Sequence, residues 1–520
     1  MIKRRHLVKT LGLMSLGAWT GALIGPLRAR AQSGNPLINT FINPLKIPPL
    51  MRGTEGDSGR EFDLRMAAGS SRFFADRLTP TLGFNGDYLG PTLHFRQGEK
   101  VQLAVHNHIG EPTTVHWHGM RIPPEFDGGP RQVIAPGQTW RPKFTILQDA
   151  NTCWYHSHML HKTGEQVYRG LAGMIIVDDD GANKLPLPRT YGIDDIPLIL
   201  QDRAFQPDGS LRYSTDYDDV IKGMRGDTIL INGTRSPYFI PTNTIVRFRI
   251  LNAANARVFT LAFSDGRGFH QIASDGGLLP KAVAMKQLML GPAERAEIVV
   301  DVSDGLAVNL VSLPKAPDYP IYNGAMSRLM REMDIEHFDL LAIRPAASLT
   351  PGLAIPSELR PVNPLQERDA VTTRQFKLMM GFGSRSGEDL GGGQGNRDGS
   401  GGGYGGGVFL INGRTMDMNY INERVHFGDT EIWELHNTSP MTHPFHLHGV
   451  HFQLLDRNGA APPANESGWK DTVLVRTEEK IRIIMRFADF ADPQNPYMYH
   501  CHNLEHEDRG MMGQFLVEPT

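Results

Sequence analysis

Gly510-Met-Met-Gly-Gln-Phe-Leu-Val517 repeats the pattern of Gly170-Leu-Ala-Gly-Met-Ile-Ile-Val177 from the first third of the chain. A second repeat pairs Pro444-Phe-His-Leu-His-Gly449 with Thr114-Val-His-Trp-His-Gly119. Repeats in the same order indicate that the first and last thirds are copies of one structural unit. The middle third is interpreted as a diverged copy, which makes three units in the chain.

Short strands and tight turns account for the regular pattern of each unit. Ile229-Leu-Ile-Asn-Gly233 and Phe409-Leu-Ile-Asn-Gly413 are apolar runs that end in Asn-Gly, a strong turn signal. Long amphipathic helices are not expected. Apolar and polar residues alternate, as in half-buried strands, at 100–106, 245–251, 297–302 and 480–487. We therefore predict an all-β protein with domains at 45–180, 190–345 and 369–520.

Composition narrows the class of protein. The chain has 520 residues, of which 53 are basic and 56 acidic, and its formal net charge is −3. It therefore lacks the excess of positive charge that is typical of nucleic-acid-binding proteins. Two cysteines exclude a disulfide scaffold. Residues 391–407 contain 11 glycines in 17 positions, so 381–407 is predicted to be a loop within the last domain.

Residues 1–31 are interpreted as an export signal. Arg4-Arg5 precedes an apolar stretch from Leu11 to Leu27, and Ala29-Arg30-Ala31 has the form of a cleavage site. The paired arginines resemble a twin-arginine signal, which predicts a periplasmic protein exported in folded form. The alternative is a membrane anchor. No later segment is apolar enough to span a bilayer, so no span is expected in the mature protein.

Histidines supply the chemistry. Five His-x-His pairs occur, and residues two apart on a strand point two imidazoles at one spot. Imidazole suits copper and zinc. Four pairs lie in the repeated segments, two in each outer unit: 116/118, 156/158, 446/448 and 500/502. The fifth pair, His106 and His108, has no repeat and is expected at the surface. Ordinary structural roles are also expected for His94, His426 and His451.

The C-terminal histidine cluster adds sulfur ligands. On a strand, Cys501 faces away from its neighbours His500 and His502, so one metal site can lie on each side of the strand. Cysteine, two histidines and a weak axial methionine are the ligands of a blue-copper site. Cys501, His506 and Met511 supply three of these, and His443 is the natural fourth.

Four strings together resemble the signatures of the multicopper oxidases. They are His116-Trp-His-Gly119, Trp154-Tyr-His-Ser-His158, His443-Pro-Phe-His-Leu-His-Gly449 and His500-Cys-His-Asn-Leu-Glu-His506 with Met511. The resemblance covers the mature chain and looks closest to the three-domain bacterial laccases and copper-efflux oxidases. It implies three cupredoxin-like Greek-key β-sandwich domains and four copper ions per chain.

The resemblance also implies a role for each ligand. A type-1 copper would be held by His443, Cys501, His506 and Met511. A type-2 copper would be held by His116 and His446. Two type-3 coppers would be held by His118, His156, His158, His448, His500 and His502. The middle unit, which has no His-x-His pair, is expected to act as a spacer.

Reduction of dioxygen to water consumes protons as well as electrons. Asp127 matches the acid that the family places near its copper cluster, and Glu507 matches a second one. Carboxylates at such a site can relay protons. The alternatives are a turn-forming role for Asp127 before Gly128 and a solvated position for Glu507. Cys153 is expected to be a small buried residue, because its only possible disulfide partner would be a copper ligand.

Three hypotheses for the function remain open. The first is a laccase-like oxidase of phenols and aromatic amines, and the second is an oxidase of Cu(I) or Fe(II) that serves copper tolerance. The third is a periplasmic copper-binding or structural protein with little turnover. Met441 is a candidate substrate-binding residue, although Ser439 replaces an upstream acid of the efflux enzymes. Met326, Met330 and Met333 are expected to pack in the core. O2 and a small donor are the expected partners of a monomer.

Overall fold

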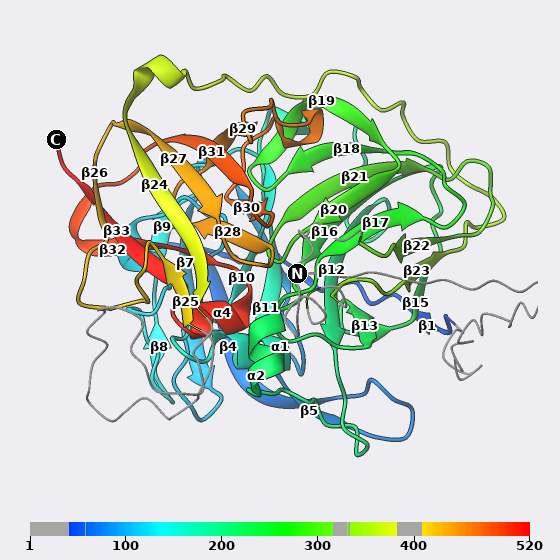
Figure 1. Cartoon of the computed structure of the whole chain (residues 1–520). Helices are drawn as coiled ribbons and strands as arrows, with labels where there is room; N and C mark the ends of the chain where they lie inside the picture. Colours follow the sequence, from blue (N-terminus) through cyan, green and yellow to red (C-terminus); the bar gives the residue numbers. More distant parts are fainter. Residues whose placement is uncertain (1–40, 58, 316–329, 331–332, 382–407) are drawn as a thin grey trace, which may run out of the picture. The chain divides into compact units, whose positions relative to one another are not determined.

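The structure is a computed structural model that describes residues 41–57, 59–315, 330, 333–381 and 408–520. The predicted signal 1–31, Met326 and all of the glycine-rich stretch after Gly381 lie outside the described residues. In the part described, six β-sheets form three pairs, and every strand except β1 belongs to a pair from its own third of the chain (Figure 1). The helices there are five to seven residues long. The predicted all-β class is confirmed.

Two sheets in the first third share one apolar core. Their orders are β3-β4-β7-β8, with β5 and β9 attached, and β10-β11-β6-β2. Alternate residues Phe62, Leu64 and Met66 of one strand are buried, as the period of two requires. The strands are β2 (Leu50–Met51), β3 (Thr54–Gly56), β4 (Gly59–Ser71), β5 (Thr79–Phe84), β6 (Thr92–Arg96), β7 (Lys100–His108), β8 (Thr139–Trp140), β9 (Lys143–Thr145), β10 (Asn151–His156) and β11 (Ala172–Asp178).

The middle third, green in Figure 1, forms sheets β14-β13-β12-β16-β21-β18-β19 and β1-β15-β23-β22-β17-β20 around a second core. Its first strand precedes the first unit in sequence, so the predicted start at residue 190 misses it. The strands are β1 (Asn43–Pro44), β12 (Asp195–Arg203), β13 (Thr228–Ile231), β14 (Thr234–Arg235), β15 (Pro237–Phe239), β16 (Ile245–Asn252), β17 (Phe259–Phe263), β18 (Phe269–Ser274), β19 (Gly277–Met285), β20 (Gln287–Leu290), β21 (Arg295–Asp301), β22 (Val308–Ser312) and β23 (Phe338–Ile343).

The last third, yellow to red in Figure 1, forms sheets β25-β24-β27-β31-β29 and β26-β33-β32-β28-β30 around a third core. Met330 and Met333 are buried in this core, as predicted. The strands are β24 (Ala370–Gly381), β25 (Val408–Ile411), β26 (Glu423–His426), β27 (Thr430–Asn437), β28 (His443–Leu447), β29 (Phe452–Arg457), β30 (Thr472–Val475), β31 (Lys480–Arg486), β32 (Asp492–Cys501) and β33 (Met512–Glu518).

Short helices follow the histidine strands. α1 (Thr163–Arg169) follows β10, and α4 (Leu504–Asp508) follows β32. The helix α2 (Tyr217–Lys222) lies beside α4, as does α1 (Figure 1). Four 3-10 turns complete the elements: η1 (Pro124–Phe126), η2 (Ala182–Lys184), η3 (Glu367–Asp369) and η4 (Ala464–Glu466). Among the described residues, no helix has the length and apolar character needed to cross a membrane.

Both Asn-Gly signals form turns. Asn232 and Gly233 have φ of 50° and 68°, and Asn412 and Gly413 have φ of 52° and 75°. Two successive positive φ values are the geometry of a type I′ turn, which suits the twist of adjacent strands.

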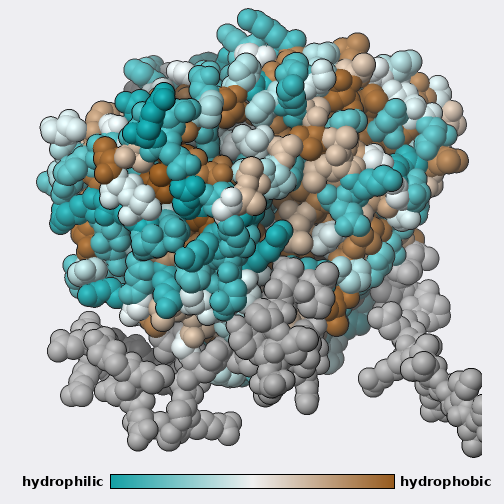
Figure 2. Space-filling model, turned by 45° about the horizontal axis from the view of Figure 1, so that its top comes forward, coloured by the Kyte–Doolittle hydropathy of each residue, from teal (hydrophilic) through white to brown (hydrophobic). Residues whose placement is uncertain are grey.

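On the face of the molecule shown in Figure 2, hydrophilic and hydrophobic residues are intermixed.

The repeated glycines have a packing reason. Gly173 of β11 pairs with Tyr155 of β10, and Gly513 of β33 pairs with Tyr499 of β32. A Cβ at Gly173 would lie 2.3 Å from Cζ of Tyr155, and one at Gly513 would lie 2.4 Å from Cζ of Tyr499. Each tyrosine ring therefore covers the glycine across the ladder, which explains the second glycine of both repeats.

We expect Gly513→Ala to lower the free energy of unfolding by about 1–3 kcal/mol, the usual cost of overpacking a core. The added methyl must displace the buried ring of Tyr499. Chemical denaturation monitored by tryptophan fluorescence measures this. Gly86→Ala is the control, because the nearest atom to its Cβ would be 3.9 Å away. Equal stability of the two variants would contradict the packing argument.

Candidate metal centre

Strand register brings the histidine pairs of the two outer units together. His446 of β28 lies opposite His500 of β32, and His116 forms a β-bridge with His156 at the end of β10. His116 stacks on His448 with ring centroids 3.8 Å apart, and His118 stacks on His446 at 3.6 Å. All eight histidines of the four repeated pairs are at most 1 % exposed. One buried cluster therefore draws four imidazoles from each outer unit.

Backbone carbonyls fix the tautomers of four of these rings. A carbonyl oxygen can only accept a hydrogen bond, so the Nδ1 that contacts it carries the proton and Nε2 keeps its lone pair. These contacts join His116 to Asp127 O (2.9 Å), His156 to Ser157 O (2.7 Å), His446 to Asp471 O (2.9 Å) and His500 to Cys501 O (3.1 Å). Such outer contacts are typical of histidines that bind metals.

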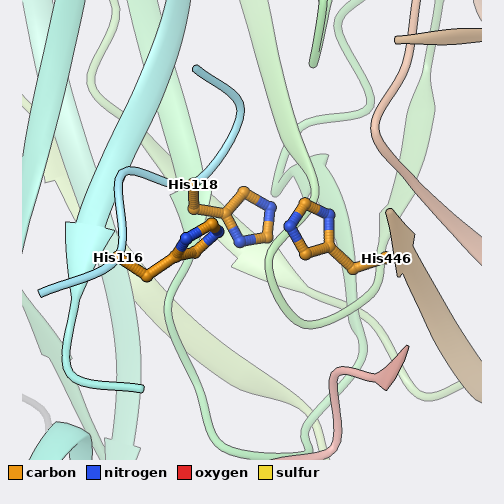
Figure 3. Close-up of side chains that lie close together, drawn as sticks. All are labelled: His116, His118 and His446. Carbon is orange, nitrogen blue, oxygen red and sulfur yellow. The ribbon is translucent and has the colours of Figure 1, made fainter. Parts of the chain in front are cut away.

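The inward nitrogens form three groups. In each group, one nitrogen from every ring lies within 4.8 Å of the others. The groups are His116, His118 and His446 (Figure 3); His118, His156 and His502; and His158, His448 and His500. Nε2 of His116, His156 and His446 is buried without a hydrogen-bond partner. Buried polar atoms are rarely left unpaired, so this donor set fits bound metal ions.

Burial keeps these rings neutral. It lowers the pKa of His156 to about 3 and that of His158 to about 4, and it holds the pKa values of His116, His118 and His448 well below the ordinary range. Neutral imidazole is the form that binds a metal. Burial therefore favours, in these five rings, the form that a metal would bind.

A separate group lies on the other side of β32. Nδ1 of His443 is 3.3 Å from Sγ of Cys501, and Nδ1 of His506 is 3.7 Å from the same sulfur. Nε2 of His506 donates to Ile221 O at 3.1 Å, so Nδ1, which faces the sulfur, keeps its lone pair. Met511 is fully buried in the same core, and its carbonyl accepts from the Cys501 amide at 3.0 Å.

Electrostatics at Cys501 also fit a metal. Burial raises the pKa of its thiol. The thiolate therefore needs a cation nearby, and a coordinating thiol is deprotonated outright. The amide of Asn503 points at the sulfur at 3.4 Å and favours negative charge there.

Two carboxylates border the cluster. Oδ2 of Asp127 lies 2.7 Å from Nδ1 of His448, and its Oδ1 has no partner. Burial raises its pKa well above the ordinary value. Oε2 of Glu507 lies 3.2 Å from Nδ1 of His500. Burial opposes ionisation of Glu507, but the nearby His158 and His500 outweigh burial, so the pKa of Glu507 is lowered. The alternative of a solvated Glu507 is wrong, because this side chain is fully buried.

Other predicted positions lie apart from these groups. Met441 is 1 % exposed in the apolar core of the last third, so its substrate-binding role stays a prediction. Cys153 is buried and free, as expected. His106 pairs with Asp63 near the surface and His108 is exposed. His451 is buried and contacts Gly119 O at 3.0 Å.

No sequence pattern indicated Asp471, Arg295 or the contact that Ser439 makes with His443. Asp471 touches both His118 and His446, and Oγ of Ser439 lies 2.6 Å from Nε2 of His443. Asp471 and Arg295 lie in strings that contain no histidine. Only the fold brings them to the cluster.

The sequence matches known proteins along its whole length. Multicopper oxidase family models match residues 68–182 and 392–520. Multicopper oxidase mco of Staphylococcus haemolyticus is 34 % identical over 482 residues, which cover 91 % of this chain and 92 % of that protein. The chain belongs to the multicopper oxidase family. Within it, the chain is also 33 % identical to Cell division protein FtsP of Dickeya dadantii, over 100 % of this chain and 99 % of that protein.

Solved structures of other multicopper oxidases share the fold. A laccase-like multicopper oxidase CueO from Ochrobactrum sp. matches with a TM-score of 0.78 and 35 % identity, over 91 % of this chain and 100 % of that chain. A multicopper oxidase from Campylobacter jejuni, described as a metallo-oxidase, matches with a TM-score of 0.77 and 27 % identity, over 93 % and 97 %. The predicted family and cupredoxin-like fold are thus confirmed.

Acid should destabilise the copper-free protein. Below about pH 6.5 the unfolded chain protonates its histidines, whereas buried His156 and His158 stay neutral down to about pH 3–4. The unfolded state then binds more protons, so the free energy of unfolding falls as the pH drops from about 6.5 to about 4. Calorimetry at pH 7 and 4.5 measures this as a lower Tm. His158→Gln should reduce the difference in Tm between the two pH values, and the exposed control His108→Gln should not. A Tm that does not depend on pH would contradict this prediction.

Proposed function

We propose that this multicopper oxidase is an active copper enzyme that couples one-electron oxidation of small aromatic donors to reduction of dioxygen to water. The observation that carries the proposal is the pair of ligand groups on opposite sides of β32. Cys501 belongs to the group on one side, whereas its neighbours His500 and His502 belong to two different groups of the histidine cluster on the other side. A few covalent bonds therefore connect a site for single electrons to a site that collects them.

The ligand sets follow the four groups of buried donor atoms. When bound, copper would supply one-electron redox change and affinity for dioxygen. We assign a type-1 copper to His443, Cys501, His506 and Met511. We assign a type-2 copper to His116 and His446. We assign two type-3 coppers to His118, His156, His158, His448, His500 and His502. The unpaired inward nitrogens and the neutral state of these rings support the four-copper assignment.

Asp127 and Glu507 would move the protons that water formation consumes. The two carboxylates border different histidines of one cluster and have opposite pKa shifts. Burial favours the protonated form of Asp127, which can donate a proton, whereas the neighbouring histidines favour the ionised form of Glu507, which can accept one. Each carboxylate then has a distinct role in proton supply.

A laccase-like donor is the first choice, and a metal-ion donor is the alternative. The similar Ochrobactrum enzyme is described as having oxidase activity towards lignin model compounds, which supports aromatic donors. The similar Campylobacter jejuni multicopper oxidase, which is described as a metallo-oxidase, supports the alternative. The FtsP-named relatives raise a role without turnover, but this chain carries every ligand that the copper sites need.

Location and assembly are proposed on the sequence alone. The twin-arginine pattern of residues 1–31 supports export to the periplasm in folded form. A folded, metal-loaded monomer is the expected mature protein.

The first test is oxygen uptake by copper-loaded protein supplied with Cu(I) or with a methoxyphenol, with and without added Cu(II). Fast uptake on the phenol alone supports the laccase-like function; uptake only with Cu(I) or added Cu(II) supports the metal-ion alternative. Cys501→Ser should abolish the blue colour and lower uptake by more than the roughly 10–100-fold that loss of an outer contact costs. Protein that binds four coppers without uptake on any donor would contradict enzymatic function.

Asp127→Asn should lower the rate of oxygen reduction by about 100-fold or more, the usual contribution of a positioned acid, while the blue colour stays. Stopped-flow reoxidation of the reduced protein by oxygen measures this rate. Glu125→Gln is the control, because Glu125 is exposed two residues away. A rate equal to that of the control would remove Asp127 from the proton path.

A further inference from the structure

Arg295, at the start of β21, contacts all three thirds of the chain. Its side chain is fully buried, and its five N–H groups meet five oxygens. Nε donates to Thr152 O of the first third at 2.9 Å. Within the middle third, Nη1 donates to Ala293 O and Nη2 to Asp275 O, both at 3.1 Å. To the last third, Nη1 donates to Oδ1 of Asp471 at 2.7 Å and Nη2 to Oδ2 of Asp471 at 2.5 Å.

Asp471 transmits this contact to two histidines. Its Oδ1 accepts from Nε2 of His118 at 3.1 Å, and its backbone carbonyl accepts from Nδ1 of His446 at 2.9 Å. These two rings stack within 11° of parallel. Their other nitrogens, Nδ1 of His118 and Nε2 of His446, point inward and lack a partner, and both rings belong to the group in Figure 3.

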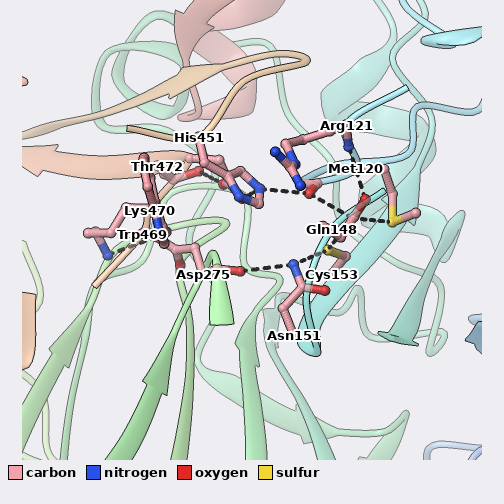
Figure 4. Close-up of polar contacts among 12 residues, drawn as sticks. Met120, Arg121, Gln148, Asn151, Cys153, Asp275, His451, Trp469, Lys470 and Thr472 are labelled. Carbon is pink, nitrogen blue, oxygen red and sulfur yellow. Dashed lines mark hydrogen bonds and ion pairs between the residues drawn. The ribbon is translucent and has the colours of Figure 1, made fainter. Parts of the chain in front are cut away.

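The surroundings leave this ion pair little room. Gly119, directly after His118, has φ of +86°, and a Cβ there would lie 2.5 Å from Nη2 of Arg295 and 2.8 Å from Oδ2 of Asp471. Lys470 binds Oδ2 of Asp275 at 2.7 Å, and Asn151 reaches the carbonyl of Asp275 (Figure 4). The Arg295 guanidinium also offsets burial and lowers the pKa of Asp471 well below its ordinary value.

We propose that Arg295 is a positioning residue for the histidine cluster, and that it acts through Asp471 to hold His118 and His446 at their ligating angles. This inference rests on the proposed copper assignment. The middle third then does more than separate the outer thirds, because its own side chain orients one ligand ring from each of them. Lysine cannot replace Arg295, since it cannot form two parallel bonds to one carboxylate.

The test compares Arg295→Lys with Arg249→Lys in the copper-loaded full chain. Arg249 is a matched control: it is buried on the neighbouring strand β16, pairs with Asp195 at 2.8 Å and contacts Oγ1 of Thr152, but the bonds found for its side chain reach no histidine. We measure copper per chain and the electron paramagnetic resonance spectrum of the type-2 copper. Blue absorption reports the Cys501 site.

Arg295→Lys should weaken copper binding at His116 and His446 by roughly 10–100-fold, as loss of an outer contact does, and should change the type-2 spectrum. Blue absorption should stay, and Arg249→Lys should keep the wild-type spectrum and copper content. If Arg295→Lys does not fold, Asp471→Asn, which keeps the shape but loses the charge, should show the same spectral change.

Three results would overturn the inference. One is a wild-type spectrum and copper content in Arg295→Lys. Another is equal copper loss in Arg295→Lys and Arg249→Lys, which would mean that any buried arginine of this sheet acts only through stability. The third is wild-type protein that binds no copper at the histidine cluster; that result alone would also remove the proposed function.

Discussion

Eight imidazoles packed in a closed interior are the constraint on which the rest of this structure depends. A ring that gives one nitrogen to the protein keeps the other for a metal, and a buried polar atom without a partner is costly. In four rings, Nδ1 donates to a backbone carbonyl of a strand or connecting loop. The requirement for two outer units follows, since each supplies half of the rings.

The charged side chains near the cluster are different groups from the histidine rings that face inward. Neutral rings and backbone carbonyls carry no net charge, and two buried carboxylates nearby each have a cationic partner. Asp471 is matched by Arg295, and Asp275 by Lys470. Such pairs contribute little net stability compared with apolar packing, but breaking one leaves a buried charge uncompensated. This cost makes them effective at fixing the orientation of their neighbours.

Much of the fold and the grouping of the histidine and cysteine side chains could be predicted, because both depend on local periods. The two-residue period of a strand places His500 and His502 on one face and Cys501 on the other, and the group of His443, Cys501 and His506 is found as expected. Asp471 and Arg295 could not be predicted, because their roles come from contacts between residues 176 positions apart. The buried state of Glu507 was also open, since an acid in a polar string is equally compatible with an exposed position.

The placement of β1 has a consequence for how the chain can be divided. Asn43 and Pro44 pair in parallel with Pro237 and Tyr238 at the edge of the middle sheet, and Arg344 donates to Phe41 O nearby. A fragment cut at residues 190–345 would therefore carry β15 as a bare sheet edge, the kind of surface on which chains join one another. The middle third is complete only with residues that precede the first third, so the described chain is interlocked rather than strung from separable modules.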